Sequence, residues 1–239
     1  MIKKRIVILL MYFFCGVGLI VAQVTQLNSK EKKQGWKLLF DGISTKGWMS
    51  SDGSAFPQKG WVINNGELTT KPEQGIHGTD IITDGEYSDF ELRVDFKTTE
   101  GANSGIKYFF TKYEKGGLLG LEYQIIDDER HPDAKLGRNG NRKCAALYDM
   151  FPAGNDKKVN PPGEWNTALI VSKGMHVEHW LNGKKVLDFD RLSPSYMEAF
   201  QASKYRESVP VFGSVKKGHI LLQFHGDVVS FRNIRIKAI

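Results

Sequence analysis

The sequence predicts an all-β protein, a sandwich of two packed antiparallel sheets. Apolar and polar residues alternate strictly over 89–97, which is the pattern of a half-buried strand. Asn-Gly pairs at 65–66 and 182–183 stand between apolar runs and indicate hairpins, since both residues tolerate the positive φ of tight turns. Turn signals recur along the chain, and about twelve strands are expected, too many for one open twisted sheet.

Residues 1–22 have the three parts of a signal peptide. A basic cluster at 3–5 precedes an apolar run over 6–21, and the small residue Ala22 ends the segment. The alternative is a retained membrane anchor, because the apolar run is about as long as the shortest membrane-spanning helices. Glycines within the run and the terminal alanine favour cleavage, so we expect a secreted or periplasmic protein with no stable membrane anchor.

The mature chain is expected to consist of a flexible tether over 23–34 and one domain over 35–239. The tether is inferred from its polar, charged composition. Loss of the basic cluster at 3–5 lowers the formal net charge from +6 to +3, and the absence of a Lys/Arg-rich run makes nucleic acid a poor partner. Cys144 is then the only cysteine, so no internal disulfide can form and stability must come from a sizeable core.

The first half of the domain contains the clearest strands. A short apolar strand within 35–42 ends in an Asp-Gly turn, and residues 61–70 are expected to form a hairpin. Another strand covers 106–113. In the segment 89–97, the residues expected to point into the core are Phe90, Leu92, Val94 and Phe96.

The second half is expected to alternate strands with long loops. The charged segment 129–143 has no apolar periodicity and is predicted to be a loop, of the kind that is often functional or mobile. A short strand over 144–151 and a second long loop follow, then two or three strands over 166–189. Residues 218–239 are expected to close the chain as a hairpin around Gly226 and Asp227.

One short helix is expected, starting after Ser193. Ser193 is suited to cap the helix, and Pro194 is favoured at the first helical position because its φ is fixed and it has no amide hydrogen to leave unpaired. Tyr196, Ala199 and Phe200 then share one face.

The stretch 118–128 (LLGLEYQIIDD) has an apolar face and a polar face. With period two, Leu121 and Tyr123 point to one side, and Glu122 and Gln124 to the other. Asp127 joins Glu122 only if a β-bulge intervenes. A carboxylate and an amide on one sheet face suit a sugar site, and an ordinary solvent-facing strand is the equally open alternative.

Further polar residues could converge with this strand. In the segment GHILLQFHG (218–226), Gln223 and His225 share a face, and an imidazole is suited to proton transfer near neutral pH. The alternative is that His225 closes a hairpin in water. Alternation also places Lys107 on the polar side of its strand.

Metal and cofactor signals are weak. The segment 127–129 with His131 could bind a divalent cation, although such acidic clusters are more often simply solvated. No metal ligands are assigned and no organic cofactor is expected, since the phosphate-binding and zinc motifs are absent. Cys144 lies among small and apolar residues and is expected to be buried and inert. His179 is expected in the core.

An ordered set of motifs resembles the 3-keto-disaccharide hydrolase family. The matching segments are LLFDG…GW (38–48), WVINNGEL (61–68), YSDFELRVDFK with GANSGIKY (87–108), LEYQIIDD (121–128), GEWNTALI (163–170), HWLNGKKV (179–186), and GHILLQFHG with FRNIRIK (218–237). The resemblance implies a concanavalin A-like jelly-roll sandwich, secreted by a bacterium that degrades glycans. It also implies a motif-rich sheet face that carries Asn103, Ser104, Glu122, Gln124 and His225.

A looser resemblance connects the segment 122–127 with laminarinase-type retaining glycosidases. Their catalytic strand carries three spaced acids, whereas this chain has Gln124 in the middle and the shorter Asp127 at the end. Retaining hydrolysis needs two carboxyl groups about 5–5.5 Å apart. Glu122 and Asp127 could supply that pair only with the bulge.

The family resemblance therefore implies a hydrolase that cleaves 3-keto-glycosides or 3-keto-disaccharides. Its expected route is removal of the C2 proton, elimination of the C1 substituent and hydration, which needs no paired nucleophile. We expect Glu122 and His225 to be catalytic, one as base and the other as acid. The expected substrate-binding residues are Asn103, Lys107, Gln124, Asp127 and Gln223. A retaining glycosidase acting on unoxidised glycans and a non-catalytic carbohydrate-binding module are the alternatives.

Overall fold

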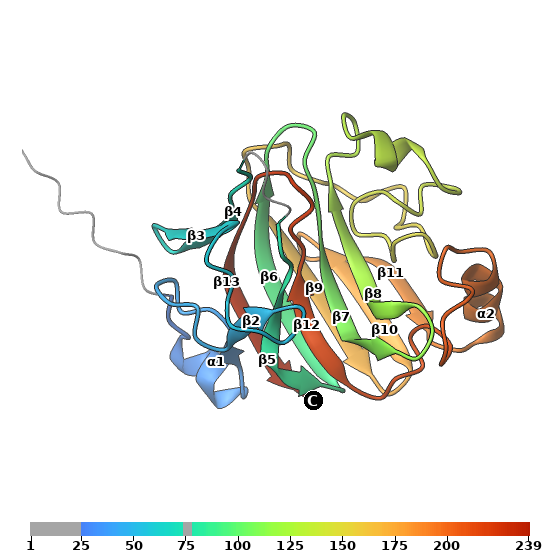
Figure 1. Ribbon diagram of the computed structural model, residues 1–239, viewed down its shortest axis with the longest axis horizontal. Helices are drawn as coiled ribbons and strands as arrows, with labels where there is room; N and C mark the ends of the chain where they lie inside the picture. Colours follow the sequence, from blue (N-terminus) through green and yellow to red (C-terminus); the bar gives the residue numbers. More distant parts are fainter. Residues whose placement is uncertain (1–24, 74–77) are drawn as a thin grey trace, which may run out of the picture.

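The computed structural model describes residues 25–73 and 78–239, and in them the chain forms two antiparallel sheets packed face to face (Figure 1). The predicted all-β sandwich is thus confirmed. The predicted signal peptide lies outside the described residues. None of the helices in the described ranges is long and apolar enough to cross a membrane.

The larger sheet has eight strands. Its order is β11-β10-β9-β6-β13-β4-β3, and β1 pairs with β13. The bounds are β1 Lys37–Leu38, β3 Trp61–Asn64, β4 Glu67–Thr70, β6 Phe90–Thr98, β9 Asn166–Lys173, β10 His176–Leu181, β11 Lys184–Asp190 and β13 Val229–Ala238. The inward residues of β6 are those expected from the alternation, and each is at most 1% exposed.

The smaller sheet has five strands in the order β2-β5-β12-β7-β8. The bounds are β2 Trp48–Ser50, β5 Ile81–Tyr87, β7 Asn103–Tyr113, β8 Gly117–Ile126 and β12 Gly218–Leu222. In Figure 1, β9, β10 and β11 of the larger sheet lie behind β7 and β8. The core lies between the two sheets, where Tyr108 and Tyr123 of the smaller sheet meet His179 of the larger one.

Both predicted Asn-Gly hairpins are present. Asn65 and Gly66 join β3 to β4 with φ of 50° and 79°, and Asn182 and Gly183 join β10 to β11 with φ of 50° and 82°. These positive values are the reason for the Asn-Gly sequence, because most other residues would be strained there. The two turns fix the registers of their hairpins.

The predicted hairpin over 218–239 is wrong. β12 pairs with β5 and β7 in the smaller sheet, whereas β13 pairs with β4 and β6 in the larger one. The segment 223–228 therefore crosses from one sheet to the other. A connection that contains Gly226 and Asp227 between two apolar runs is compatible with a hairpin and also with a passage between the two sheets. The local sequence pattern does not distinguish these two possibilities.

The predicted strand over 144–151 is also wrong. This segment is a series of turns, with Ala145 and Asp149 at φ of 65° and 60°. Only isolated bridges are present, one of them between Leu147 and Tyr123. The apolar side chains are buried as predicted, but they cover the edge of β8 instead of extending the sheet.

In the described ranges, two α-helices flank the sandwich. α2 (Pro194–Gln201) begins at the predicted cap, where the Ser193 hydroxyl oxygen accepts the Tyr196 amide. α1 (Ser29–Lys33) lies in the segment expected to be a flexible tether, so that expectation fails for these residues. Asn28 and Glu31 form a reciprocal capping box, a signal that the sequence carried within a charged segment.

His179 is fully buried in the core, as predicted. Its Nδ1 lies 3.0 Å from the Ala145 carbonyl oxygen and its Nε2 lies 2.8 Å from the Tyr108 hydroxyl. The ring therefore donates to Ala145 and accepts from Tyr108 as a neutral imidazole. Burial lowers the pKa of His179 to about 4. His179 thus connects the larger sheet to the segment that covers β8.

Candidate active site

The candidate site lies on the front face of the smaller sheet, defined here as the face turned away from the core that carries Lys107, Glu122 and Gln124. Lys107 is directly opposite Glu122 in the β7–β8 register, and Gly105 is directly opposite Gln124. Directly opposite residues project from the same face of a sheet. The structure therefore brings Glu122, Gln124 and Lys107 together.

Glu122 and Lys107 form a largely buried ion pair. The Lys107 Nζ lies 3.7 Å from the Glu122 Oε2, and the two side chains are 18% and 6% exposed. Two side chains of opposite formal charge thus lie close together in a place with little access to water. This pair places one base and one cation within reach of the same small ligand.

Gly105 makes room for the Glu122 side chain. A Cβ atom at this position would lie 2.7 Å from Glu122 Oε1 and 3.0 Å from its Cγ. Real Cβ contacts are not this short, so any other residue would displace the carboxylate. Glycine is needed here because the Glu122 side chain lies against the Gly105 backbone, and not because the backbone has a positive φ.

We expect Gly105→Ala to lower kcat by about 100-fold while leaving the fold intact, because a shift of about 1 Å in a catalytic group can cost that much. Steady-state kinetics and the thermal unfolding midpoint check this. Gly85→Ala in the neighbouring β5 is the matched control, since its Cβ would meet nothing closer than the Tyr87 hydroxyl at 3.4 Å. Equal activity in the two variants would contradict the positioning role.

Two glutamines flank Gly105 across the sheet. Gln124 lies on one side. On the other side, the backbone amide of Gln223 donates to the Gly105 carbonyl oxygen at 3.0 Å. Gln223 is two residues beyond Leu221, which is opposite Lys107, so alternation places Gln223 on the front face. The structure thus adds Gln223 to the group formed by Glu122 and Gln124.

Three buried amide oxygens near this row have no hydrogen-bond partner within residues 25–73 and 78–239. They are Asn103 Oδ1, Gln124 Oε1 and Gln223 Oε1. Asn103 shares the front-face alternation with Gly105, and its backbone amide donates to Asp227 Oδ2 at 2.9 Å. Buried acceptors are normally satisfied, so these oxygens are suited to accept from the hydroxyl groups of a ligand.

His225 lies at the rim of the site and not on a strand. β12 ends at Leu222, and His225 is exposed in the crossing segment. Its ring centroid lies 6.3 Å from that of His131. Burial raises the pKa of Asp80 above its usual value, while the positive charges of Lys107 and His225 act in the opposite direction. Asp80 therefore lies close enough to both residues for their charges to affect its pKa.

Tyr148 and Lys204 form a wall beside Glu122. The Tyr148 hydroxyl donates to Asp133 Oδ2 at 2.8 Å, and the Lys204 Nζ lies 4.3 Å from the centre of the Tyr148 ring. Arg142 joins Asp133 to Asp149 through hydrogen bonds of 2.8 Å each. Asp149 Oδ2 in turn accepts the Lys204 backbone amide at 2.8 Å. The wall is therefore held by a connected polar network.

Lys204 adds a second cation near Glu122. Loss of water around its side chain lowers the pKa of Lys204, while the negative charge of Glu122 acts in the opposite direction. The residue as a whole is exposed, but its ammonium group lies over the Tyr148 and Tyr205 rings, which accounts for the partial loss of water. No ion pair of that group is present in the described ranges. It is available to a ligand.

Asp127 is directed into a turn and not toward Glu122. Its Oδ2 accepts from the Gly101 amide and the Arg130 guanidinium, and its Oδ1 accepts from the Glu129 and Arg130 amides. Burial acts to raise the pKa of Asp127, but these hydrogen bonds together lower it. The carboxylate closes the turn after β8.

The bulge that would align Asp127 with Glu122 is absent. The β7–β8 pairing is regular from Leu121 to Ile126, and its register shift falls earlier, between Tyr108 and Thr111. Strand alternation therefore puts Asp127 on the opposite side from Glu122. The structure does not bring these two carboxylates together.

The remaining candidates do not form a metal centre. Among residues 25–73 and 78–239, no group of three or more His, Cys, Asp or Glu side chains is placed to hold a metal ion. The His131 Nδ1 accepts the Asp133 amide at 3.1 Å and caps a short 3-10 helix, Pro132–Lys135. Burial raises the pKa of the Cys144 thiol to about 12, which agrees with the predicted inert thiol.

Sequence reasoning missed Asp80, Tyr148 and Lys204. All three lie in irregular segments, where periodicity does not indicate which way a side chain points. The only sequence signal for Tyr148 was the apolar run 144–151, which predicted burial but not contact with Glu122. Lys204 follows α2 and carried no signal.

The fold and the site together define a β-sandwich protein with a group of polar side chains on the front face of its smaller sheet. Residues 35–237 match the family model described as the 3-keto-alpha-glucoside-1,2-lyase-like domain. The chain belongs to this family, as the motifs predicted.

Comparisons with individual proteins agree. The chain is 33% identical to a 3-keto-disaccharide hydrolase of Bacteroides thetaiotaomicron in an alignment 243 residues long, which covers 91% of this chain and 83% of the relative. Two Parabacteroides distasonis crystal structures, whose descriptions assign them provisionally to the glycosyl hydrolases, are each 32% identical. The match to the first has a TM-score of 0.79 and covers 91% of this chain and 100% of that structure. The match to the second has a TM-score of 0.66 and covers 85% of this chain and 99% of that structure.

A more distant glycosidic hydrolase shares the fold alone, with 11% identity and a TM-score of 0.50 over 85% of this chain and 95% of its own. The jelly-roll sandwich implied by the resemblance is thus confirmed. The family and the relatives indicate a hydrolase-type enzyme.

Proposed function

We propose that this protein cleaves the glycosidic bond of 3-keto-glycosides on the front face of the smaller sheet, by elimination followed by hydration. The observation that carries the proposal is the buried carboxylate of Glu122, which pairs with Lys107 and does not have Asp127 as a partner. A retaining mechanism needs two close carboxyl groups, whereas elimination needs one base and one cation. The family description and the curated relative support the 3-keto substrate class.

The chemistry follows from the ketone at C3 of the sugar. The ketone acidifies the C2 hydrogen, so a base can remove that proton and leave an enolate. The enolate electrons then form the C1–C2 double bond as the C1–O bond breaks, and the leaving group takes a proton. Water adds to C1 and a proton returns to C2, which gives net hydrolysis.

In this proposal Glu122 is the base, because its carboxylate lies in the buried part of the site. Lys107, 3.7 Å from that carboxylate, stabilises the negative charge that develops on the C3 oxygen. Buried electrostatic contacts of this kind are stronger than the same contacts in water.

His225 donates the proton to the leaving group. Its exposed position at the rim suits a departing sugar or aglycone, which must leave toward water. The carboxyl group of Asp80 lies near His225 and Lys107 at this edge of the site. The oxygens of Asn103, Gln124 and Gln223 accept from sugar hydroxyls, and Asp127 acts only through the turn that it closes.

Lys204 supplies a second positive charge to the developing enolate. We expect Lys204→Met to lower kcat by about 10- to 100-fold, the range for loss of one charged hydrogen bond, and Lys204→Arg to keep part of the activity. Kinetics on a 3-keto-glucoside measure this. Lys217→Met is the control, because Lys217 pairs with Glu86 outside the site. A Lys204→Met enzyme with unchanged kcat would remove Lys204 from the proposal.

The substrate assay tests the proposal against its alternatives. The protein is incubated with 3-keto-trehalose and 3-keto-lactose beside trehalose and lactose, and released monosaccharides are measured. Release from the 3-keto sugars alone is expected. Release from the unoxidised sugars would instead indicate a glycosidase, and binding without release would indicate a carbohydrate-binding module.

The proposal includes export by the N-terminal signal peptide. The basic cluster, apolar run and terminal Ala22 support it. Mass spectrometry of the mature protein would read the expected first residue, Gln23, and an intact N-terminus would contradict cleavage.

A further inference from the structure

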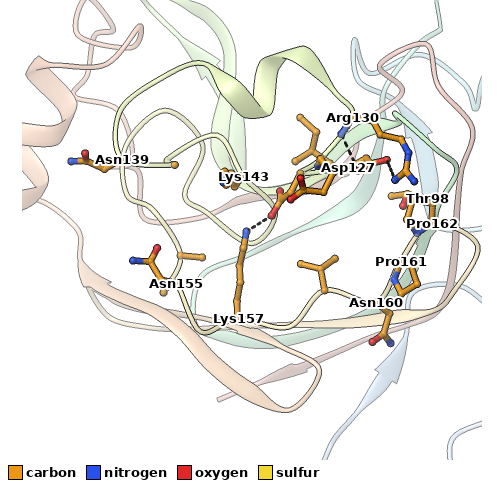
Figure 2. A pocket seen from close by; sticks show the side chains of 17 residues that line it. Thr98, Asp127, Arg130, Asn139, Lys143, Asn155, Lys157, Asn160, Pro161 and Pro162 are labelled. Carbon is orange, nitrogen blue, oxygen red and sulfur yellow. Dashed lines mark hydrogen bonds and ion pairs between the residues drawn. The ribbon is translucent and has the colours of Figure 1, made fainter.

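A cavity lies at the end of the sandwich where β6 and β8 end, and Figure 2 shows the side chains that line it. Its volume is about 910 Å³, within the range of small-molecule sites. Three segments line it: the end of β6 at Thr98, the turn and loop 126–143, and the segment 153–162. Glu122 and Lys107 do not line it, so it is distinct from the proposed active site.

Buried polar contacts connect the segments that line the cavity. The Lys157 Nζ lies 2.8 Å from Asp128 Oδ2, and both side chains are less than one-fifth exposed. Asp128 Oδ1 also accepts the Cys144 amide at 2.7 Å, and Lys157 donates to the Cys144 carbonyl. These contacts join the lining segments to one another, so the cavity is formed before any ligand binds.

The acidic side chains of the lining already have partners. Asp127 accepts from three backbone amides and from Arg130, as described above, and Asp128 is paired with Lys157. Glu129 is largely exposed and pairs with Lys135 outside the cavity. The acidic lining therefore offers little attraction to a cation.

Lys143 is the basic residue of the lining whose charge is not compensated in the described ranges. Its backbone amide donates to the Gly140 carbonyl at 3.0 Å, and its Cδ atom lies 3.5 Å from the position of a Cβ at Gly140. The residue is partly buried, and no ion pair of its ammonium group is present in the described part of the chain. A partly buried, unpaired charge is stabilised by a bound anion.

The rest of the lining favours a polyhydroxylated ligand. In Figure 2, Lys157 lies near the centre of the lining with Asn155 beside it, and Pro161 and Pro162 stand on the opposite side. The Asn139 side chain lies farther out and is directed away from them. The Asn155 side chain is exposed, and its amide can both donate and accept hydrogen bonds. The proline rings offer apolar surface to sugar C–H groups.

We propose that this cavity is a second ligand site, which binds a carboxylated sugar of the hexuronate class through Lys143. The ammonium group binds the carboxylate, and Asn155 binds hydroxyls. The site is independent of the proposed cleavage reaction, so its failure would leave that proposal untouched.

Isothermal titration of the full mature protein tests this with glucuronate, glucose and inorganic phosphate as probes. Glucuronate is expected to bind, with glucose weaker by about tenfold or more because it lacks the charge, a difference of about 1.4 kcal/mol. Equal binding of glucose would overturn the role of the charge. Phosphate binding as tight as glucuronate would overturn the sugar, and absence of glucuronate binding would overturn the site.

Variants locate the binding. Lys143→Gln is expected to weaken glucuronate binding by about tenfold or more. Lys158→Gln is the control: Lys158 is exposed next to Lys157 in the chain, and its replacement should leave binding unchanged. Asn155→Ala provides a second variant with little risk to folding, because Asn155 is exposed and has no positive φ, and it should also weaken binding. Glu122→Gln should bind glucuronate as the wild type does. Loss of binding in Glu122→Gln, or full binding in both cavity variants, would overturn the proposal.

Discussion

Replacement of Glu122 by glutamine is expected to lower kcat on a 3-keto-glucoside by about 100- to 10,000-fold, the usual contribution of a general base. Glutamine keeps the size of the side chain and its place over Gly105, but it cannot take the C2 proton. The change also leaves Lys107 without its carboxylate partner at 3.7 Å. We therefore expect a small loss of stability beside the large loss of activity.

Glu91→Gln is the matched control for this variant. Glu91 lies on β6 of the other sheet and pairs with Lys237 on the surface at 2.7 Å. It should retain wild-type kcat and a similar unfolding midpoint. A Glu122→Gln enzyme that is folded and more than about one-tenth as active as the wild type would remove Glu122 as the base.

The stability of the protein is expected to fall by about 3 kcal/mol between pH 6.5 and pH 4, through His179 alone. The pKa of His179 is lowered to about 4 by burial, from 6.5 in the unfolded chain. Between these values the unfolded state binds the proton and the folded state does not, so acid favours unfolding. The contribution is complete above pH 6.5 and is lost as the pH falls to 4.

Chemical denaturation across this pH range measures the effect. His179→Phe should remove this part of the pH dependence and also destabilise the protein by about 2–5 kcal/mol at pH 7, since it leaves the Tyr108 hydroxyl and the Ala145 carbonyl unpaired. His176→Gln, on the exposed end of the same strand, is the control and should keep the wild-type slope. A His179→Phe variant with the wild-type pH slope would contradict this account.

The same histidine links stability to the site. His179 holds the Ala145 carbonyl, the Ala145 amide donates to the Gln124 carbonyl at 2.8 Å, and the Tyr148 amide donates to the Glu122 carbonyl at 3.0 Å. The segment 144–148 therefore lies between a core residue and the strand that carries the proposed base.

The fold was predictable wherever local chemistry determines structure. Period-two alternation placed the inward face of β6, and the two Asn-Gly pairs gave the hairpins. The crossing at 223–228 was not predictable, because the choice of sheet for β12 and β13 depends on packing between distant strands. The prediction of a strand over 144–151 was wrong for a related reason, because burial alone does not show whether an apolar run joins a sheet.

The candidate site was predictable only along strands. Alternation put Glu122, Gln124 and Lys107 on one face, and the register of β7 and β8 then made them neighbours. Gln223 joined them through the β12 pairing, which the sequence did not specify. Asp80 and Lys204 belong to loops whose positions depend on tertiary contacts, and no local pattern locates them.

Loss of deuterium from C2 of the sugar tests the central claim most directly. A 3-keto-glucoside deuterated at C2 is incubated with the enzyme in ordinary water, the reaction is stopped early, and product and unreacted substrate are examined by NMR. A parallel incubation with Glu122→Gln corrects for spontaneous exchange. The account predicts product without deuterium at C2 while the remaining substrate keeps it, and product that retains deuterium at C2 would contradict elimination.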